Sequence, residues 1–191
     1  MLIILDEAYF EYARHNPHYP DSMAYRYDNV ITLRTFSKIY GLAGLRVGYG
    51  FAHEELIANL LKVKLPFEPS VPAQAGAIAA LDDAAFVERS LETNARGLAT
   101  VMAAMRQMGF DVIPSEANFV MVPLDTAETA RWLTEELLRR GVIVRPLGAF
   151  GLPNAIRIST GTEQDNRMLL DALEQLPIHL YLNDREALCR R

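Results

Sequence analysis

The sequence contains 191 residues, half of them hydrophobic and 23% of them charged. This is the composition of a globular protein, and it excludes a disordered or low-complexity chain. Acidic residues outnumber basic ones by 24 to 19, for a net charge of -5, which argues against nucleic-acid binding because that function needs a basic surface. The single cysteine, Cys189, excludes a disulfide framework and a cysteine-rich metal site.

The hydrophobic residues lie in short runs. None approaches the ~20 residues that span a bilayer. From Met1 the chain passes directly into a strand-like run at residues 2–5, without the basic flank and cleavage site of a signal peptide. We therefore expect a cytoplasmic protein that does not contact a membrane.

The first half of the chain shows the pattern of strands alternating with helices and loops. Its short apolar runs predict buried strands, and its i, i+3, i+4 spacings predict helices. We expect strands at residues 2–5, 30–33 and 45–51, a loop at 14–28, helices at 53–63 and 73–81, and a proline-rich break at 64–72. Continuous apolar strands with crossover connections are typical of a larger parallel sheet.

The second half predicts a small α+β unit. An apolar stripe after Asp82 and Asp83 predicts a long helix that stops near Gly109. Beyond it we expect strands at residues 110–113, 119–122, 142–144 and 156–159, a helix at 127–140, and a last helix capped by Thr162 that runs to about residue 176. The residues from 177 to 191 are charged and aperiodic, and we expect them to be poorly ordered.

A domain boundary is expected within the long helix, near residues 83–108. This divides the chain into part of a large domain at 1–85, a small domain at 86–178 and a tail at 179–191. Two or three parallel strands make a poor free-standing sheet, because a parallel sheet needs both faces covered. The first half therefore has the pattern of a fold whose earlier part is absent from this sequence.

Two segments could carry chemistry. Asp6 follows the first strand directly, and ligands of open α/β sheets bind outside the carboxyl ends of the strands. The second strand is followed by a turn that contains Thr35, Ser37 and Lys38, with Arg46 soon after. Hydroxyls, backbone N–H groups and a guanidinium together suit a phosphate, although no nucleotide P-loop motif is present. Taken singly, an aspartate after a strand most often caps a turn, and a lone lysine is most often solvated.

In combination these segments are more specific. The combination consists of LDEAY at residues 5–9, TFSK at 35–38 and GLRVGY at 44–49. Together these segments resemble the pyridoxal-phosphate aminotransferases of fold type I. Four longer runs are most similar to the histidinol-phosphate aminotransferases within that family. They are TLRTFSK at 32–38, GLAGLR at 41–46, EANFV at 116–120 and IRISTGT at 156–162. The resemblance covers about residues 2–176. It implies a partial large domain with a parallel-rich sheet and helices, followed by a small α+β domain.

The resemblance also implies a cofactor, pyridoxal 5'-phosphate, and a role for each matching residue. Lys38 matches the catalytic lysine that forms a Schiff base with the cofactor and then moves the substrate proton. Asp6 matches the carboxylate that pairs with the pyridine nitrogen and keeps it protonated, so that the ring can accept electrons. Tyr9 matches the tyrosine that hydrogen-bonds the ring's phenolic oxygen. Three further residues match the phosphate-binding groups: Thr35, Ser37 and Arg46.

For the substrate, Arg157 matches the arginine that clamps the α-carboxylate, a task that suits a planar guanidinium. Asn118 is a second candidate for substrate binding, although a turn-forming asparagine explains it equally well. Arg145 either faces the site or pairs with a nearby acid.

The activity implied is transamination of histidinol phosphate with 2-oxoglutarate, in histidine biosynthesis, by a homodimer. Two alternatives stay open. The same residues serve other fold type I enzymes that act on other amino acids or decarboxylate them. A catalytically incompetent fragment could instead bind a partner through the exposed face of its incomplete sheet. Family members carry about another half-chain before residue 2, which supplies the rest of the pocket, and the family does not lead us to expect the charged tail.

Overall fold

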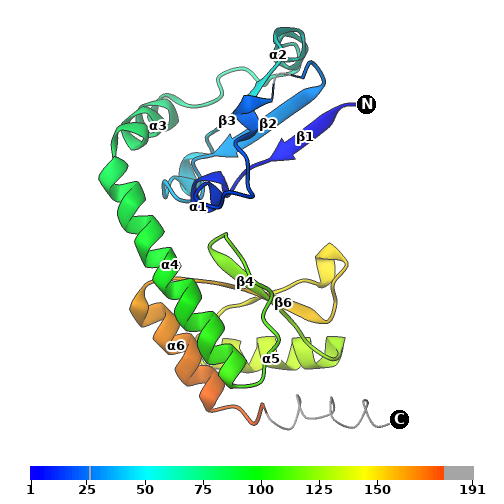
Figure 1. Ribbon diagram of the computed structural model, residues 1–191, viewed down its shortest axis with the longest axis vertical. Helices are drawn as coiled ribbons and strands as arrows, with labels where there is room; N and C mark the ends of the chain where they lie inside the picture. The colour runs from blue at the N-terminus through cyan, green and yellow to red at the C-terminus, as the bar shows by residue number, and fades with distance from the viewer. Residues whose placement is uncertain (26, 179–191) are drawn as a thin grey trace. The chain divides into compact units, whose positions relative to one another are not determined.

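The computed structural model describes residues 1–25 and 27–178. The chain divides into two compact units, Met1–Leu91 and Glu92–Arg191, and the division falls inside the long helix α4 (Ala84–Gln107). Each unit has its own three-stranded sheet (Figure 1). Within the described ranges, no helix is long and apolar enough to cross a membrane.

The sheet of the first unit is mixed. Strand β1 (Ile3–Asp6) pairs in parallel with β2 (Val30–Thr35), and β2 pairs antiparallel with β3 (Gly48–Ala52). The helices of this unit are α1 (Phe10–Ala13), α2 (Glu54–Leu61) and α3 (Val71–Asp82), with short 3-10 turns η1 (Ser22–Ala24) and η2 (Ala43–Leu45). The third strand was expected from residue 45 in a parallel sheet. It begins instead at Gly48, because residues 43–45 form η2, and it runs antiparallel.

A small apolar cluster holds the turn after β2 in place. Phe36 and Val47, on either side of this turn, pack with Ala73 and Ala77 of α3. Helix α3 begins at Ser70, whose side chain accepts the Ala73 N–H, and a proline stands in its first turn. The structure therefore fixes the segment between β2 and β3, which contains the lysine motif.

The second unit is an antiparallel sheet packed against helices. Strand β6 (Ala155–Ser159) lies between β4 (Phe119–Pro123) and β5 (Arg145–Pro146). Its core combines the buried faces of β4 and β6 with apolar residues of α4, α5 (Ala127–Arg139) and α6 (Glu163–Glu174). Thr162 caps α6 in a capping box with Asp165, as the sequence predicted for that residue.

Two predicted strands of this unit, 110–113 and 142–144, are wrong. Gly109 (φ 91°) and Gly141 (φ 81°) end helices in the left-handed conformation. The next residue then donates its N–H back to a helix carbonyl, Phe110 to Met105 (3.0 Å) and Val142 to Leu137 (2.9 Å). These are Schellman-type caps, so both segments run as loops into the core. Their apolar side chains signalled burial and not strand pairing; Ile113 forms only an isolated bridge with Met121.

The end of the second unit also differs from expectation. Residues from 177 onward were predicted to be poorly ordered, yet Ile178 is buried in the core of the second unit. An apolar side chain that reaches the core outweighs the charged composition of its surroundings. The remaining tail, 179–191, lies outside the described residues.

Candidate functional site

The carboxyl ends of β1 and β2 carry two of the predicted residues of the first unit, Asp6 and Thr35. Asp6 is the last residue of β1 and pairs in register with Leu33, two residues before Thr35 at the end of β2. Strand alternation puts Asp6, Leu33 and Thr35 on one face of the sheet. Asp6 is exposed, and its Oδ1 accepts the Ala8 N–H at 3.1 Å.

Lys38 lies in the turn after β2. Its Nζ is 5.1 Å from the centroid of the Tyr9 ring, so the chain that leaves β1 and the chain that leaves β2 meet at this amine. Both residues are half-buried. An amine at this distance from an aromatic face makes a cation–π contact that orients the lysine side chain.

The hydroxyls and the guanidinium predicted to bind phosphate form a connected group. The Ser37 N–H donates to Thr35 Oγ1 (3.1 Å), and Arg46 Nη1 donates to Ser37 Oγ (3.3 Å) and to the Ala43 carbonyl (2.8 Å). Arg46 has a left-handed backbone, with φ 53°, a conformation that costs energy in a residue other than glycine and persists only where the surroundings impose it. This turn aims the exposed guanidinium of Arg46 at the hydroxyl of Ser37.

A buried acid and a half-buried phenol connect α1 to the lysine turn. Glu11 of α1 and Tyr40, two residues after Lys38, share a side-chain hydrogen bond. Burial raises the pKa of Glu11, although the Arg34 guanidinium opposes this. Burial and the neighbouring Glu11 carboxylate raise the pKa of Tyr40 to about 12. The phenol therefore keeps its proton and ties α1 to the lysine turn.

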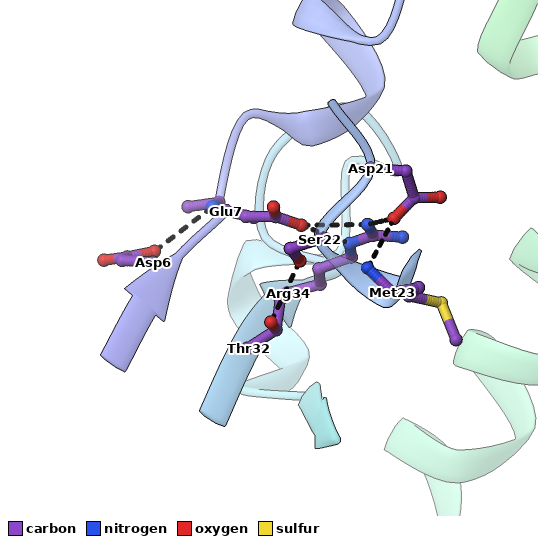
Figure 2. Close-up of polar contacts among 8 residues, drawn as sticks. Asp6, Glu7, Asp21, Ser22, Met23, Thr32 and Arg34 are labelled. Atoms are coloured by element: carbon purple, nitrogen blue, oxygen red, sulfur yellow. Dashed lines mark hydrogen bonds and ion pairs between the residues drawn. The ribbon is translucent and has the colours of Figure 1, made fainter. Parts of the chain in front are cut away.

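The sequence did not assign a role to an ionic cluster on the opposite face of the same strand ends, which joins a buried ion pair to an exposed aspartate. Arg34 Nε and Nη2 lie 2.9 and 2.8 Å from Glu7 Oε2, and Nη2 donates to Asp21 Oδ1 at 2.6 Å (Figure 2). Both Glu7 and Arg34 are buried. One feature of the sequence could have revealed this cluster. Two opposite charges, Glu7 and Arg34, stand immediately next to the candidate residues Asp6 and Thr35.

In the second unit, Arg157 stands on the sheet face opposite the helices. It pairs in register with Met121 on one side and with Arg145 on the other, and its guanidinium carbon lies 5.0 Å from the centroid of the Phe119 ring. Within residues 27–178, the Arg157 Nε is a buried side-chain nitrogen without a hydrogen-bond partner. A buried donor without a partner is costly, and two arginines facing each other repel; both features suit a site for an anion.

Asn118 lies beside this face. It precedes β4, and its carbonyl accepts the Thr160 N–H (3.0 Å) and hydroxyl (3.1 Å). The single proton of the Thr160 hydroxyl is shared between this carbonyl and the closer acceptor, Asn94 Oδ1 of α4, at 2.7 Å. These bonds fix the backbone of Asn118 next to the end of β6, two residues beyond Arg157.

Comparison with known proteins identifies the class. The family model of aminotransferase class I and II matches residues 1–173, and the chain belongs to this family. Histidinol-phosphate aminotransferase 2 of Ralstonia nicotianae is 46% identical over 177 residues, and histidinol-phosphate aminotransferase of a Geobacillus species is 44% identical over 178. The matches cover 91% and 92% of this chain, but 47% and 48% of the relatives, so the chain spans about half the length of the curated relatives it matches.

Solved structures show the same fold. Histidinol-phosphate aminotransferase from Sinorhizobium meliloti, in complex with pyridoxal-5'-phosphate, has a TM-score of 0.83 and 34% identity, covering 91% of this chain and 48% of that one. The enzyme from Clostridium acetobutylicum has a TM-score of 0.81 at 26% identity, covering 91% and 53%. An L-threonine-O-3-phosphate decarboxylase from Porphyromonas gingivalis shares the fold at 24% identity, with a TM-score of 0.75 and coverage of 90% and 53%. The predicted fold class, a partial fold type I large domain with a small α+β domain, is confirmed.

Proposed function

We propose that this chain is the lysine-bearing part of a pyridoxal-phosphate aminotransferase that acts on histidinol phosphate and 2-oxoglutarate. The observation that carries the proposal is the position of Lys38: its amine faces Tyr9 at 5.1 Å, next to a turn in which Arg46 and Ser37 are joined at 3.3 Å. The identity of about 45% to histidinol-phosphate aminotransferases supports the choice of substrate.

The side chains of the first unit suit the chemistry of the cofactor. Bound pyridoxal phosphate supplies a ring that accepts electrons from the substrate. The Asp6 carboxylate would hold the proton of the pyridine nitrogen, and the Tyr9 phenol would donate to the ring oxygen. The Lys38 amine would join the cofactor and later carry the proton removed from the substrate Cα. For the phosphate, the hydroxyls of Thr35 and Ser37 and the Arg46 guanidinium provide donors and positive charge.

The sheet face of the second unit that carries Arg157 suits the substrates. Glutamate carries an α-carboxylate, whereas histidinol phosphate carries a phosphate ester on the corresponding carbon, so one site has to accept either anion. Arg157 offers a fork of donors that fits both, and the buried Nε without a partner is one such donor. We assign Asn118 a place at the edge of this site. The homodimer and the cytoplasmic location remain predictions.

A second candidate function is an interaction module. Ile4 and Leu33, on the same sheet face as Asp6, are 59% and 41% exposed, and such apolar surface often binds another protein. The module would keep the fold but would not need the Lys38 amine.

One experiment separates these functions. The purified chain, alone and co-expressed with the N-terminal half of the Ralstonia nicotianae relative, is incubated with pyridoxal phosphate and then assayed with histidinol phosphate and 2-oxoglutarate. Aminotransferase function predicts a yellow, borohydride-sensitive band and glutamate formation by the completed assembly, both lost in Lys38→Ala. Absence of the band and of glutamate from every sample would favour the module. Lys62→Ala, at the exposed residue that caps the C-terminus of α2, is the matched control.

A further inference from the structure

The ionic cluster of Glu7, Arg34 and Asp21 connects three segments of the first unit. Arg34 lies on β2, Glu7 directly follows β1, and Asp21 lies in the loop before η1, where it also accepts the Met23 N–H at 2.9 Å (Figure 2). Burial would lower the pKa of Arg34, but hydrogen bonds from its guanidinium to Glu7 and Asp21 outweigh burial and raise it. The arginine therefore stays charged while it holds both acids.

The register places this cluster directly behind the proposed cofactor-binding residues, on the opposite face of the same strand ends. Asp6 pairs with Leu33, and the Glu7 N–H donates to the Leu33 carbonyl at 2.9 Å, so Glu7 and Arg34 form the next cross-strand pair. Since neighbouring residues of a strand point to opposite faces, Glu7 points away from the face of Asp6, and Arg34 points away from the face of Thr35. Each member of the ion pair is thus one backbone unit away from a proposed cofactor ligand.

The surroundings of Arg34 hold its guanidinium in a single orientation. Its central carbon lies 3.4 Å from the centroid of the Phe10 ring in α1 and 5.4 Å from that of Phe51 in β3. Nearby, the hydroxyls of Ser22 and Thr32 are hydrogen-bonded at 2.9 Å. A buried ion pair stabilises a fold no better than well-packed apolar side chains of similar size, but it demands one geometry.

We propose, on the basis of the proposed function, that Arg34 is a positioning residue: its bonds to Glu7 and Asp21 set the separation between the Asp6 carboxylate and the Lys38 amine. Arg34 does not touch the cofactor in this arrangement. It acts through the backbone of two neighbouring strand ends: the end of β1 carries Asp6, and the end of β2 leads into the turn that carries Lys38.

The test compares Arg34→Gln, Arg34→Lys and Glu7→Gln with Arg131→Gln, an exposed change on α5 in the other unit. All are made in the chain as co-expressed with the N-terminal half, and all are measured well below their unfolding midpoints. The readouts are the concentration of pyridoxal phosphate for half-maximal binding, the pH midpoint of the yellow band, and hydrogen exchange at the amides of Glu7 and Ser37.

We expect Arg34→Gln to weaken cofactor binding at least ~10-fold and to move the pH midpoint, because the carboxylate no longer faces the ring nitrogen at a fixed distance. Arg34→Lys should recover only part of the loss. The lysine keeps the positive charge, but its ammonium cannot bridge both acids in the same geometry. Arg131→Gln should match the unchanged chain. Glu7→Gln provides the same test if Arg34→Gln does not fold.

Unchanged binding and an unchanged pH midpoint in Arg34→Gln and Glu7→Gln, with only a lower unfolding temperature, would overturn the inference while leaving the proposed function intact. If the unchanged chain itself binds no cofactor, the proposed function fails. In that case faster exchange at both amides in Arg34→Gln would still support the coupling of the strand ends, and unaltered exchange would overturn it.

Discussion

Arg145 and Arg157 stand directly opposite each other in the antiparallel pairing of β5 and β6. Like charges in facing positions destabilise a sheet, and the Arg157 Nε has no hydrogen-bond partner within residues 27–178. The pair is therefore a poor arrangement for stability alone and a good one for binding an anion. It lies on the sheet face that the helices leave uncovered.

Removing Arg157 should weaken substrate binding. In the completed assembly, Arg157→Ala should raise the Michaelis constants for both glutamate and histidinol phosphate, because a charge-assisted bond worth ~1.5–3 kcal/mol is lost. This corresponds to roughly 10- to 150-fold. Steady-state kinetics with each amino donor measures the effect, and constants equal to those of the unchanged enzyme would place the anion site elsewhere.

Replacing Asp6 should affect chemistry far more than folding. Its side chain is exposed and accepts one local hydrogen bond, so Asp6→Ala should change the free energy of unfolding by no more than ~1 kcal/mol. The loss of a charge next to the reacting ring should slow proton removal from the substrate by roughly 100-fold. Chemical denaturation and deuterium exchange of the substrate Cα hydrogen give the two quantities; a parallel loss of both would contradict the assigned role.

Glu11 should make the stability of the chain depend on pH. Because folding raises its pKa above 4.5, the folded chain binds the proton more tightly than the unfolded chain. The resulting stabilisation is present below about pH 4.5 and is lost as the pH rises through the raised pKa. Glu11→Gln should therefore raise the unfolding temperature at neutral pH and change it little near pH 4. Calorimetry at both values checks the sign, and a lower unfolding temperature at neutral pH would contradict it.

Gly97 should be intolerant of a side chain although it lies within a helix. A Cβ there would lie 2.8 Å from Asn166 Nδ2, and Asn166 is held in place by two hydrogen bonds to the backbone of Gly161 (3.0 and 3.2 Å). A glycine-to-alanine change inside a helix usually stabilises the folded protein by ~1 kcal/mol. Here we expect a net loss of about 1–3 kcal/mol from overpacking, measured by denaturant unfolding. Stabilisation by this substitution would show that Asn166 moves aside freely.

Much of the fold follows from local sequence pattern. The continuous apolar runs at residues 2–5 and 119–122 and the alternating apolar and polar residues at 156–159 both predict strands, and the structure has strands there. The segments after Gly109 and Gly141 could not be separated from strands in this way. Their residues are equally apolar, and only the left-handed glycine before each shows that the backbone returns to the helix.

The candidate site was predicted only in part for a similar reason. Strand ends and motif spacing brought Asp6, Thr35 and Lys38 to one edge of a sheet. The contact between Lys38 and Tyr9 depends on how α1 folds back, and the ionic cluster of Arg34 depends on the register between β1 and β2. Neither can be read from composition or periodicity. The antiparallel direction of β3 was missed because an apolar run has the same appearance in either direction.

Mapping the covalent attachment of the cofactor tests the central claim most directly. The sequence holds three lysines, Lys38, Lys62 and Lys64, so reduction with borohydride in the presence of pyridoxal phosphate, followed by peptide mass spectrometry, distinguishes them cleanly. The cofactor is expected on the peptide containing Lys38, at close to one per chain, and on neither of the others. Labelling distributed over all three lysines, or its persistence at the same level in Lys38→Ala, would contradict the account.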